Sequence, residues 1–433
     1  MQKQLLLSKH FLQISWRYYS SHSISRILQP STSSSYWSLL QNQSFTFNDQ
    51  SSKSALNDPY FMQQLFTTTH LVSHSYDLYQ CLDMPSQLIY LDYLNKNDAQ
   101  TTQQFLQQLS QLPSGMKRLI DFRASLLSLL HHYPNQQSTL SPLESKLKSI
   151  IKEKRSSLMI KRITWQPSAT EIIEKLCQYE AVHAVTSSQD IKRRLASDRR
   201  VYGLFMKGMS NEPLVFVHVA LVSDLSNSIQ TLLNAPIHTH SFRHAICYSI
   251  TTQKGLGGIH LGNYLIREVI SQLQHSFPHL DTFATLSPIP GFRSWLMEHP
   301  QLKKRLIQLG GLHWEKNLFN MPKTSPLSIE LLRLCARYIL KEKRSNKGAL
   351  DPVANFHLRN GACAHQLQWM GDISDKGLQE SFGIMINYKY IPNKLDDHHQ
   401  HYINHGTIFV SEQEKSWLSE WLGSDVVSID CIP

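Results

Sequence analysis

The stretch Thr285-Leu-Ser287-Pro-Ile-Pro-Gly291-Phe292 places a hydroxyl group between a strand and a stiff turn. Residues 280–286 alternate loosely and predict a short strand, whereas residues 292–297 have helical spacing. Ser287 is therefore expected at the end of a strand, where active sites often collect in α/β proteins. Ser before Pro is also a good N-cap with proline at the first helical position, and these eight residues alone favour the cap.

Runs rich in β-forming residues accompany this stretch. They cover residues 201–207, 214–222, 245–250 and 282–286, and segments with helical spacing at 169–179 and 261–277 are interleaved with them. A mixture of strands and helices in this order predicts an α/β domain built around a central sheet.

The N-terminal third of the chain has a different pattern. Apolar residues recur at three- and four-residue spacing in 60–71, 101–112, 116–133 and 140–154, and these segments are separated by Pro, Gly, Asn or Asp. They predict a helical N-terminal domain, whose glutamine-rich faces suit packing or contact within a homo-oligomer. Because a charged run at 152–155 marks the junction, we expect a helical domain at 21–155 and an α/β domain at 156–433.

The first twenty residues have the composition of a mitochondrial targeting peptide. No Asp or Glu precedes Asp49, whereas Lys3, Lys9 and Arg17 alternate with apolar residues and serines. We expect removal of residues 1–20 and a mitochondrial matrix location, and the alternative is an ordinary basic helix of a bacterial cytoplasmic protein. The C-terminal residues Asp-Cys-Ile-Pro lack the Ser-Lys-Leu peroxisomal address.

Composition argues against several classes of protein. The net charge of +10, from 43 Lys and Arg against 33 Asp and Glu, favours an anionic partner, but no nucleic-acid-binding motif is legible. The longest apolar run, at 214–222, is too short to span a membrane. The six cysteines lie far apart without a CxxC pair, which argues against a zinc site and a disulfide scaffold, and we expect no metal.

A glycine-rich turn follows the strand predicted at 245–250. Its sequence, Gln253-Lys-Gly255-Leu-Gly257-Gly258-Ile-His260-Leu-Gly262, leads into the helical segment at 261–277. Backbone N–H groups in such a turn lie beside the positive end of the helix dipole and suit phosphate oxygens, although the spacing fits neither the Walker pattern nor a Rossmann fingerprint. The basic residues at 192–194 and 199–200 either bind phosphates as well or, by default, form a solvated face.

A second segment, together with the stretch around Ser287, points to one particular protein family. The stretch around Ser287, together with Asp351-Pro-Val-Ala-Asn-Phe-His357-Leu-Arg-Asn-Gly-Ala362, resembles the catalytic segments of malonyl-CoA decarboxylases. TQKGLGGIHLGNYLI at 252–266 and GIMINYKYIP at 383–392 extend the resemblance, which runs from about Arg162 to Tyr390. It implies a GNAT (acetyltransferase-like) α/β catalytic domain after the helical domain. It also implies decarboxylation of malonyl-CoA to acetyl-CoA without any metal or organic cofactor.

The resemblance further implies roles for individual residues. Ser287 matches a proton-accepting hydroxyl that contacts substrate, and His357 matches the proton donor, which suits a histidine that is protonated near neutral pH. Tyr390 and Lys175 match a tyrosine near the site and a lysine associated with activity. By residue type alone these two are a strand aromatic and a solvated helix lysine. The acyl-CoA contacts are expected from Gly257, Gly258, Ile259, His260, Leu261, Gly262 and Asn263.

Some features leave alternatives open. Position 260 carries His where some relatives are expected to carry an acidic residue, and His357 without its neighbours is typical of an inert histidine in a strand or turn. A Ser-His-Asp hydrolase would need a GxSxG motif, which Ser287 lacks, and a carboxylate, for which Asp351 and Asp372 are the candidates. A GNAT-type acyltransferase and a non-enzymatic acyl-CoA-binding protein are the competing functions.

Overall fold

The computed structural model of the chain describes residues 55–209, 211–237, 242–345, 348–411 and 426–429. Two compact units account for these residues. One comprises the described residues up to 158 together with 206–209 and 253–259, and the other comprises 159–205 and the described parts of 211–252 and 260–429. The expected targeting peptide at 1–20 lies outside the described residues.

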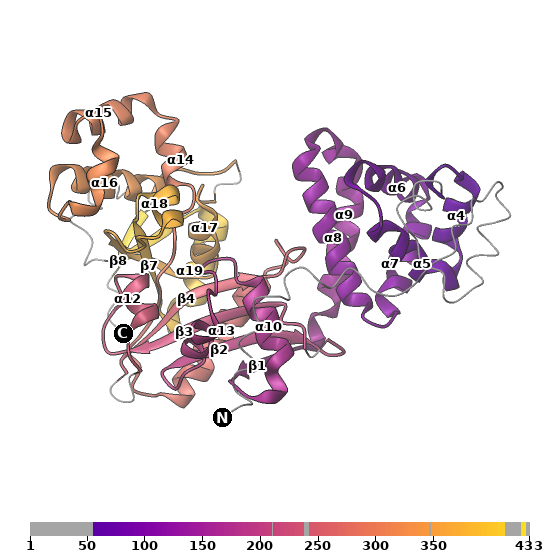
Figure 1. Ribbon diagram of the computed structural model, residues 1–433, viewed down its shortest axis with the longest axis horizontal. Coiled ribbons are helices and arrows are strands. Elements are labelled where there is room, and N and C mark those ends of the chain that lie inside the picture. Colours follow the sequence, from indigo (N-terminus) through magenta and orange to yellow (C-terminus); the bar gives the residue numbers. More distant parts are fainter. Residues whose placement is uncertain (1–54, 210, 238–241, 346–347, 412–425, 430–433) are drawn as a thin grey trace, which may run out of the picture. The chain divides into compact units, whose positions relative to one another are not determined.

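The first unit is helical, and its helices run from indigo to purple in Figure 1. They are α4 (Pro59–Thr67), α5 (Val72–Gln80), α6 (Met84–Lys96), α7 (Ala99–Gln111), α8 (Gly115–His132) and α9 (Gln137–Glu153). The four helices predicted from the sequence are confirmed as α4, α7, α8 and α9, whereas α5 and α6 were missed. The start of α6 carries a signal that could have revealed it, because the Asp83 carboxylate accepts from the Ser86 N–H at 3.0 Å and Pro85 follows.

Aromatic packing fills the centre of the helical unit. Phe66 meets Tyr90 and Phe105 edge-on with ring centroids 5.1 and 5.5 Å apart. Tyr79 meets Phe122 edge-on at 4.6 Å. Such pairs each contribute about 0.5–1.5 kcal/mol beyond the area they bury. All five rings are almost fully buried, so these helices have a core of their own.

The second unit is a mixed α/β structure around one nine-stranded sheet. The strands are β1 (Leu158–Ile163), β2 (Arg199–Met206), β3 (Val215–Val222), β4 (His244–Thr252), β5 (Thr282–Thr285), β6 (Cys363–Gln368), β7 (Met385–Tyr390), β8 (Ile408–Ser411) and β9 (Val426–Ile429). Their order is β1-β2-β3-β4-β5-β7-β6-β8-β9. β4 and β5 are parallel, and β7 runs antiparallel to β5 and to β6.

Ten α-helices accompany the described strands. They are α10 (Thr170–Tyr179), α11 (Ser188–Arg194), α12 (Ile229–Asn234), α13 (Leu261–Ser276), α14 (Phe292–Met297), α15 (Pro300–Gly310), α16 (Pro326–Leu340), α17 (Pro352–Arg359), α18 (Asp375–Ser381) and α19 (Leu395–His405). The expected β-rich runs become β2 to β5, and the expected helical segments become α10 and α13. The prediction of a helical domain followed by an α/β domain around a central sheet is confirmed.

Strands β4 and β5 separate before β4 ends. They pair from His244 opposite Thr282 to Cys247 opposite Thr285, and the Leu286 N–H donates to the Cys247 carbonyl at 3.1 Å. β5 ends there, whereas β4 continues to Thr252. The register between β3 and β4 also shifts at Tyr248, which is a β-bulge and bends the strand. The backbone of β4 beyond the bulge is therefore unpaired on its β5 side among the described residues.

Helix α17 owes its start to Asp351. The Asp351 carboxylate accepts from the N–H groups of Val353 and Ala354 at 2.9 and 2.8 Å, and Pro352 occupies the first helical position. His357 lies in the second turn of α17 and is buried. The interpretation of an isolated His357 as a residue in a strand or turn is therefore wrong, because the Asp-Pro pair starts a helix.

Replacement of Asp351 by Asn tests the capping carboxyl group, because Asn keeps a capping oxygen but does not ionise. Burial raises the pKa of Asp351 to about 6, so the native state favours its neutral form. The stability that the neutral Asp351 carboxyl group contributes is present in full below about pH 4 and is lost as the pH rises through 6. Relative to the Asn variant, the wild type should lose about 2–3 kcal/mol of unfolding free energy between pH 4 and 7. Urea unfolding at both pH values measures the difference, and a constant difference would contradict the assignment.

Candidate active site

A cavity of about 240 Å³ lies where β4 and β5 separate. Its lining comes from the loop after α10, from β4, from the chain after β5 and from α17. The residues are Val182, Cys247, Tyr248, Ser249, Ile250, Thr252, Leu286, Ser287, Pro288, Pro352, Val353, Phe356 and His357. Most of these side chains are apolar, and the cavity brings both predicted catalytic residues together.

Ser287 and His357 are hydrogen-bonded although seventy residues separate them, with Ser287 Oγ 3.1 Å from His357 Nε2. The backbone of Ser287 is fixed as well, because its N–H donates to the Ile386 carbonyl and its carbonyl accepts from the Ile386 N–H, at 2.8 and 3.0 Å. The N-cap interpretation of Ser287 is wrong. Helix α14 begins only at Phe292, with Gly291 as its cap residue, because two prolines extend the intervening chain.

Four side chains form one polar relay through the site. Ser287 Oγ donates to Thr285 Oγ1 at 2.8 Å, and Thr285 Oγ1 also accepts from the Tyr388 N–H at 3.0 Å. Since the Ser287 hydroxyl proton is used in this way, Ser287 Oγ accepts the hydrogen bond that His357 Nε2–H donates. His357 Nδ1 is then the acceptor for the Tyr390 hydroxyl, 2.8 Å away. The donor direction therefore runs from Tyr390 through His357 and Ser287 to Thr285.

The environment of His357 keeps the imidazole neutral. The ring stacks on Tyr388, with centroids 4.7 Å apart and an interplanar angle of 23°. Burial lowers the pKa of His357 to about 3. The expectation of a histidine protonated near neutral pH is therefore wrong for this site as it stands. Burial also raises the pKa of Tyr390 well above its ordinary value, so the phenol keeps its proton.

Cys247 also lines the cavity, but it is a poor nucleophile. Burial raises the pKa of its thiol to about 12, so the reactive thiolate is scarce at neutral pH. Among the described residues, no group of three or more His, Cys, Asp or Glu side chains is arranged to hold a metal ion. Besides this thiol, the cavity lining offers the imidazole of His357 and the hydroxyls of Tyr248, Ser249, Thr252 and Ser287.

Two family models match most of the chain. One, described as the malonyl-CoA decarboxylase C-terminal domain, covers residues 156–425, and the other, described as the N-terminal domain of the same enzyme, covers 77–153. The chain belongs to the malonyl-CoA decarboxylase family.

Relatives of known name and solved structures agree with this family. Mitochondrial malonyl-CoA decarboxylase of Rattus norvegicus is 35% identical over 346 residues, which is 72% of this chain and 70% of the relative. The enzyme of Mus musculus is 36% identical over 349 residues, with the same coverage. The crystal structure of malonyl-CoA decarboxylase from Rhodopseudomonas palustris has a TM-score of 0.72 at 27% identity and covers 86% of this chain and 100% of its own. The structure from Cupriavidus metallidurans has a TM-score of 0.67 at 28% identity, with coverages of 85% and 100%.

The predicted acyl-CoA segment lies outside the cavity lining in this family member. Residues 257–259 belong to the helical unit, and residues 260–263 belong to the α/β unit. His260 adopts φ = 63° immediately before α13 and makes no capping bond with its side chain. At Gly262 an added β-carbon would lie 2.7 Å from the ring of Phe356, a cavity residue. Glycine at 262 therefore allows α13 and α17 to approach closely.

Lys175 is not brought to the cavity. It lies on α10, where its ammonium pairs with the carboxylates of Glu171 and Glu212 at 2.7 and 2.9 Å. It also donates to the Asn211 carbonyl at 3.1 Å. These contacts explain Lys175 as a structural cation that ties α10 to the turn before β3.

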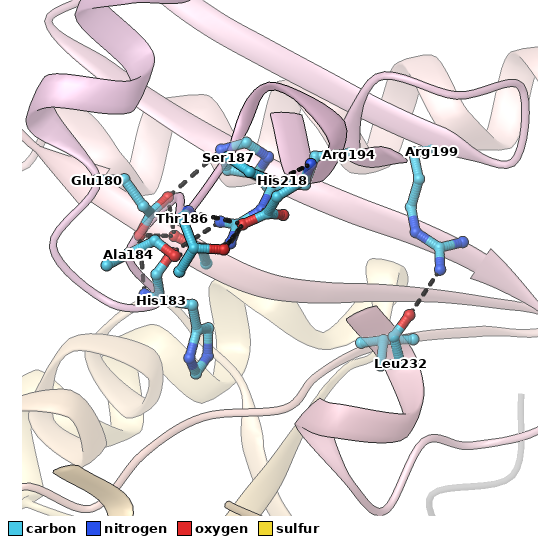
Figure 2. A network of polar contacts seen from close by, with 11 residues as sticks. Glu180, His183, Ala184, Thr186, Ser187, Arg194, Arg199, His218 and Leu232 are labelled. Carbon is cyan, nitrogen blue, oxygen red and sulfur yellow. Dashed lines mark hydrogen bonds and ion pairs between the residues drawn. The ribbon is translucent and has the colours of Figure 1, made fainter. Parts of the chain in front are cut away.

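The basic cluster is only partly the solvated face expected by default, because Lys192 is exposed whereas Arg194 and Arg199 are buried. Arg194 and Arg199 are each only 2% exposed. Figure 2 shows Arg194 beside the loop after α10, where it donates to the carbonyls of His183 and Ala184 at 2.7 and 3.1 Å. Arg199 donates to the Leu232 carbonyl at 2.8 Å. Both guanidinium groups also pair with carboxylates, Arg194 with Asp190 at 2.7 Å and Arg199 with Asp198 at 2.8 Å, so they hold backbone in place and are neutralised locally.

Glu180 holds one wall of the cavity, and Figure 2 shows this residue within a network of polar contacts. Its carboxylate accepts from the Val182 N–H and from Ser249 Oγ, each at 2.8 Å, and both of those residues line the cavity. His218 Nε2 lies 3.3 Å from the same carboxylate. Burial lowers the pKa of His218 to about 3, so this contact involves a neutral ring at neutral pH. Glu180 lies in no recognisable motif, and the stretch around Ser287 includes Thr285 without indicating its role.

Replacement of His357 by Gln tests the buried, neutral imidazole. The pKa of His357 lies well below that of an unfolded histidine, so the unfolded chain takes up the proton first as the pH falls. The part of the free energy of unfolding that depends on neutral His357 should be present in full above about pH 6.5 and should decrease towards pH 3. Relative to the Gln variant, the wild type should lose about 2 kcal/mol between pH 7 and 5, as measured by urea unfolding. An unchanged difference would show that His357 is already charged or solvated.

Proposed function

We propose that the protein is a malonyl-CoA decarboxylase, which converts malonyl-CoA and a proton to acetyl-CoA and carbon dioxide with no metal or organic cofactor. The observation that carries the proposal is the pair of Ser287 and His357, hydrogen-bonded at 3.1 Å inside the cavity at the fork of β4 and β5. Their position supports a substrate whose acyl group reaches this cavity.

Decarboxylation breaks the bond between the carboxylate carbon and the methylene carbon, and its electron pair passes into a thioester enolate. The site must stabilise the enolate oxygen and deliver one proton to carbon. Hydroxyl and imidazole donors aimed at a developing oxyanion each contribute a few kcal/mol. An apolar lining also favours the change from a charged carboxylate to neutral carbon dioxide.

His357 supplies the proton in this proposal. The free site keeps it neutral, but an anionic substrate beside the ring favours the imidazolium and raises its pKa. Substrate and proton then enter together. After carbon dioxide leaves, the imidazolium returns its proton to the enolate carbon, while Ser287 Oγ orients the ring and contacts the substrate. Tyr390 accommodates both states of His357, because a hydroxyl accepts from a protonated Nδ1 as readily as it donates to a free one.

The unpaired edge of β4 gives the thioester arm a place to bind. Beyond Cys247, the strand offers backbone N–H and carbonyl groups next to the cavity. The amides of a pantetheine arm can extend the sheet there, as peptides do in β-strand addition. The contacts at residues 257–263 would serve the nucleotide part of the same ligand.

A GNAT-type acyltransferase is the main competing function, because the fold is shared. That reaction needs a base which removes a proton from an amine, and neutral His357 could act as one. The products discriminate between the two, since a transferase yields an acylated amine and free coenzyme A. A non-enzymatic acyl-CoA-binding protein would be indifferent to substitution of both Ser287 and His357.

Carbon dioxide release from malonyl-CoA tests the proposal directly. The purified full chain should release it without added metal or acyl acceptor. Ser287→Ala and His357→Asn should each lower kcat by about 10²- to 10⁴-fold, because each removes part of the proton-transfer machinery, and KM should change little. The exposed residues Ser223 and His401 provide matched controls as Ala and Asn variants. Absence of turnover in folded wild-type protein, or full activity in both site variants, would refute the proposal.

The relatives named above as mitochondrial support a mitochondrial location, and we propose the matrix as the compartment. The assembly we propose is a homo-oligomer that associates through the helical domain. Of the helices that the structure describes, none combines the length and apolar character needed to cross a membrane.

A further inference from the structure

The hydroxyl of Thr285 lies at the end of the polar relay and is held on two sides. Its oxygen accepts from Ser287 Oγ at 2.8 Å and from the Tyr388 N–H at 3.0 Å. The Asn387 side-chain amide donates to the Thr285 carbonyl at 2.6 Å, and Thr285 itself is fully buried. Because a β-branched side chain is stiff at χ1, these contacts keep Thr285 Oγ1 in one position. Thr285 therefore offers Ser287 a fixed acceptor.

The two ring nitrogens of His357 have different surroundings. Nε2 lies 3.1 Å from the hydroxyl of Ser287, which lines the cavity, whereas Nδ1 lies 2.8 Å from the hydroxyl of Tyr390. Tyr390 is buried and is not among the described residues that line the cavity. A proton that passes from the ring to a ligand in the cavity therefore leaves from Nε2.

The direction of the Ser287 hydroxyl decides which nitrogen of His357 carries a proton, because a serine hydroxyl has one proton to donate. With Thr285 as its acceptor, Ser287 Oγ keeps its lone pairs for the Nε2–H group. Without that acceptor, the ring of His357 is the described partner left to accept the hydroxyl proton. Nε2 would then be bare, and the neutral ring would carry its proton on Nδ1 and donate it to Tyr390.

We propose that Thr285 is a positioning residue, which makes Ser287 an acceptor and thereby holds a proton of His357 on Nε2, the nitrogen that faces the cavity. Thr285 acts through Ser287, because it is not among the described residues that line the cavity. The imidazolium also needs an acceptor at Nε2, so the Ser287 hydroxyl keeps its direction when His357 gains its second proton. The inference rests on the proposed function for the fate of that proton, whereas the tautomer is a property of the free protein.

Nitrogen NMR of the full chain, labelled in its histidine rings, tests the tautomer without substrate. Thr285→Val keeps the branched shape but removes the acceptor, so at pH 7 the His357 signals should change from the Nε2–H to the Nδ1–H pattern. Thr285→Ser keeps the oxygen and should retain the Nε2–H pattern. Thr282→Val is the matched control, because it alters another buried threonine of β5 that is outside the relay, and it should also retain this pattern. An unchanged tautomer in folded Thr285→Val would overturn the proposal.

Tyr390→Phe decides the question even if Thr285→Val fails to fold because the buried Tyr388 N–H loses its acceptor. Tyr390 donates to Nδ1 and is the other group that could set the tautomer. If Thr285 sets it, the Phe variant should keep the proton of His357 on Nε2. A change to the Nδ1–H pattern in this variant would assign the control to Tyr390 and refute the proposal.

Turnover of malonyl-CoA connects the tautomer to the reaction. Thr285→Val should lower kcat by roughly 10²-fold, the lower end of the range for general acid catalysis, with little change in KM. Thr285→Ser should recover most of this loss, and Thr282→Val should match the wild type. Equal losses in the Val and Ser variants at 285 would mean that Thr285 acts only on the fold, contrary to the proposal. If the wild type releases no carbon dioxide but the NMR results hold, the proposed function fails and the control of the tautomer by Thr285 stands.

Discussion

The hydrogen bond between Ser287 and His357 is the interaction on which the site depends. It joins two segments that lie seventy residues apart in the sequence, and it persists only if both side chains are held in place. Ser287 is held by its two backbone bonds to Ile386 and by the hydroxyl of Thr285. His357 is held by the helix that Asp351 caps and by the rings of Tyr388 and Tyr390. The central sheet thereby fixes both partners of a single hydrogen bond.

Burial gives this pair its chemical character. A histidine with a pKa of about 3 is neutral at neutral pH, so in the proposed mechanism it becomes an acid only when an anion enters the cavity. Its second proton then comes from solvent as the anionic substrate binds. The proton consumed in the reaction then arrives at the step in which it is needed, and an empty site has no charged ring to stabilise.

Much of this arrangement could be predicted from the sequence. Strands β2 to β5 and helices α10 and α13 have clear periodicity, and the segments around Ser287 and His357 resemble those of one family. The helix at 352–359 was missed because an Asp-Pro start was overlooked beside the histidine. The burial of Arg194 and Arg199 could not be predicted, since a basic run is usually solvated and its carbonyl partners are distant in sequence. The roles of Thr285 and Glu180 likewise depend on contacts that only the fold creates.

The protonation state of His357 is the central claim, and nitrogen NMR of protein labelled in its histidine rings measures it directly. One histidine, identified by its absence from the His357→Gln variant, should carry its proton on Nε2 and remain neutral from pH 8 down to about pH 4 in the free protein. Detection of the Nδ1–H tautomer, or of an imidazolium at pH 7 before any ligand is added, would contradict the account.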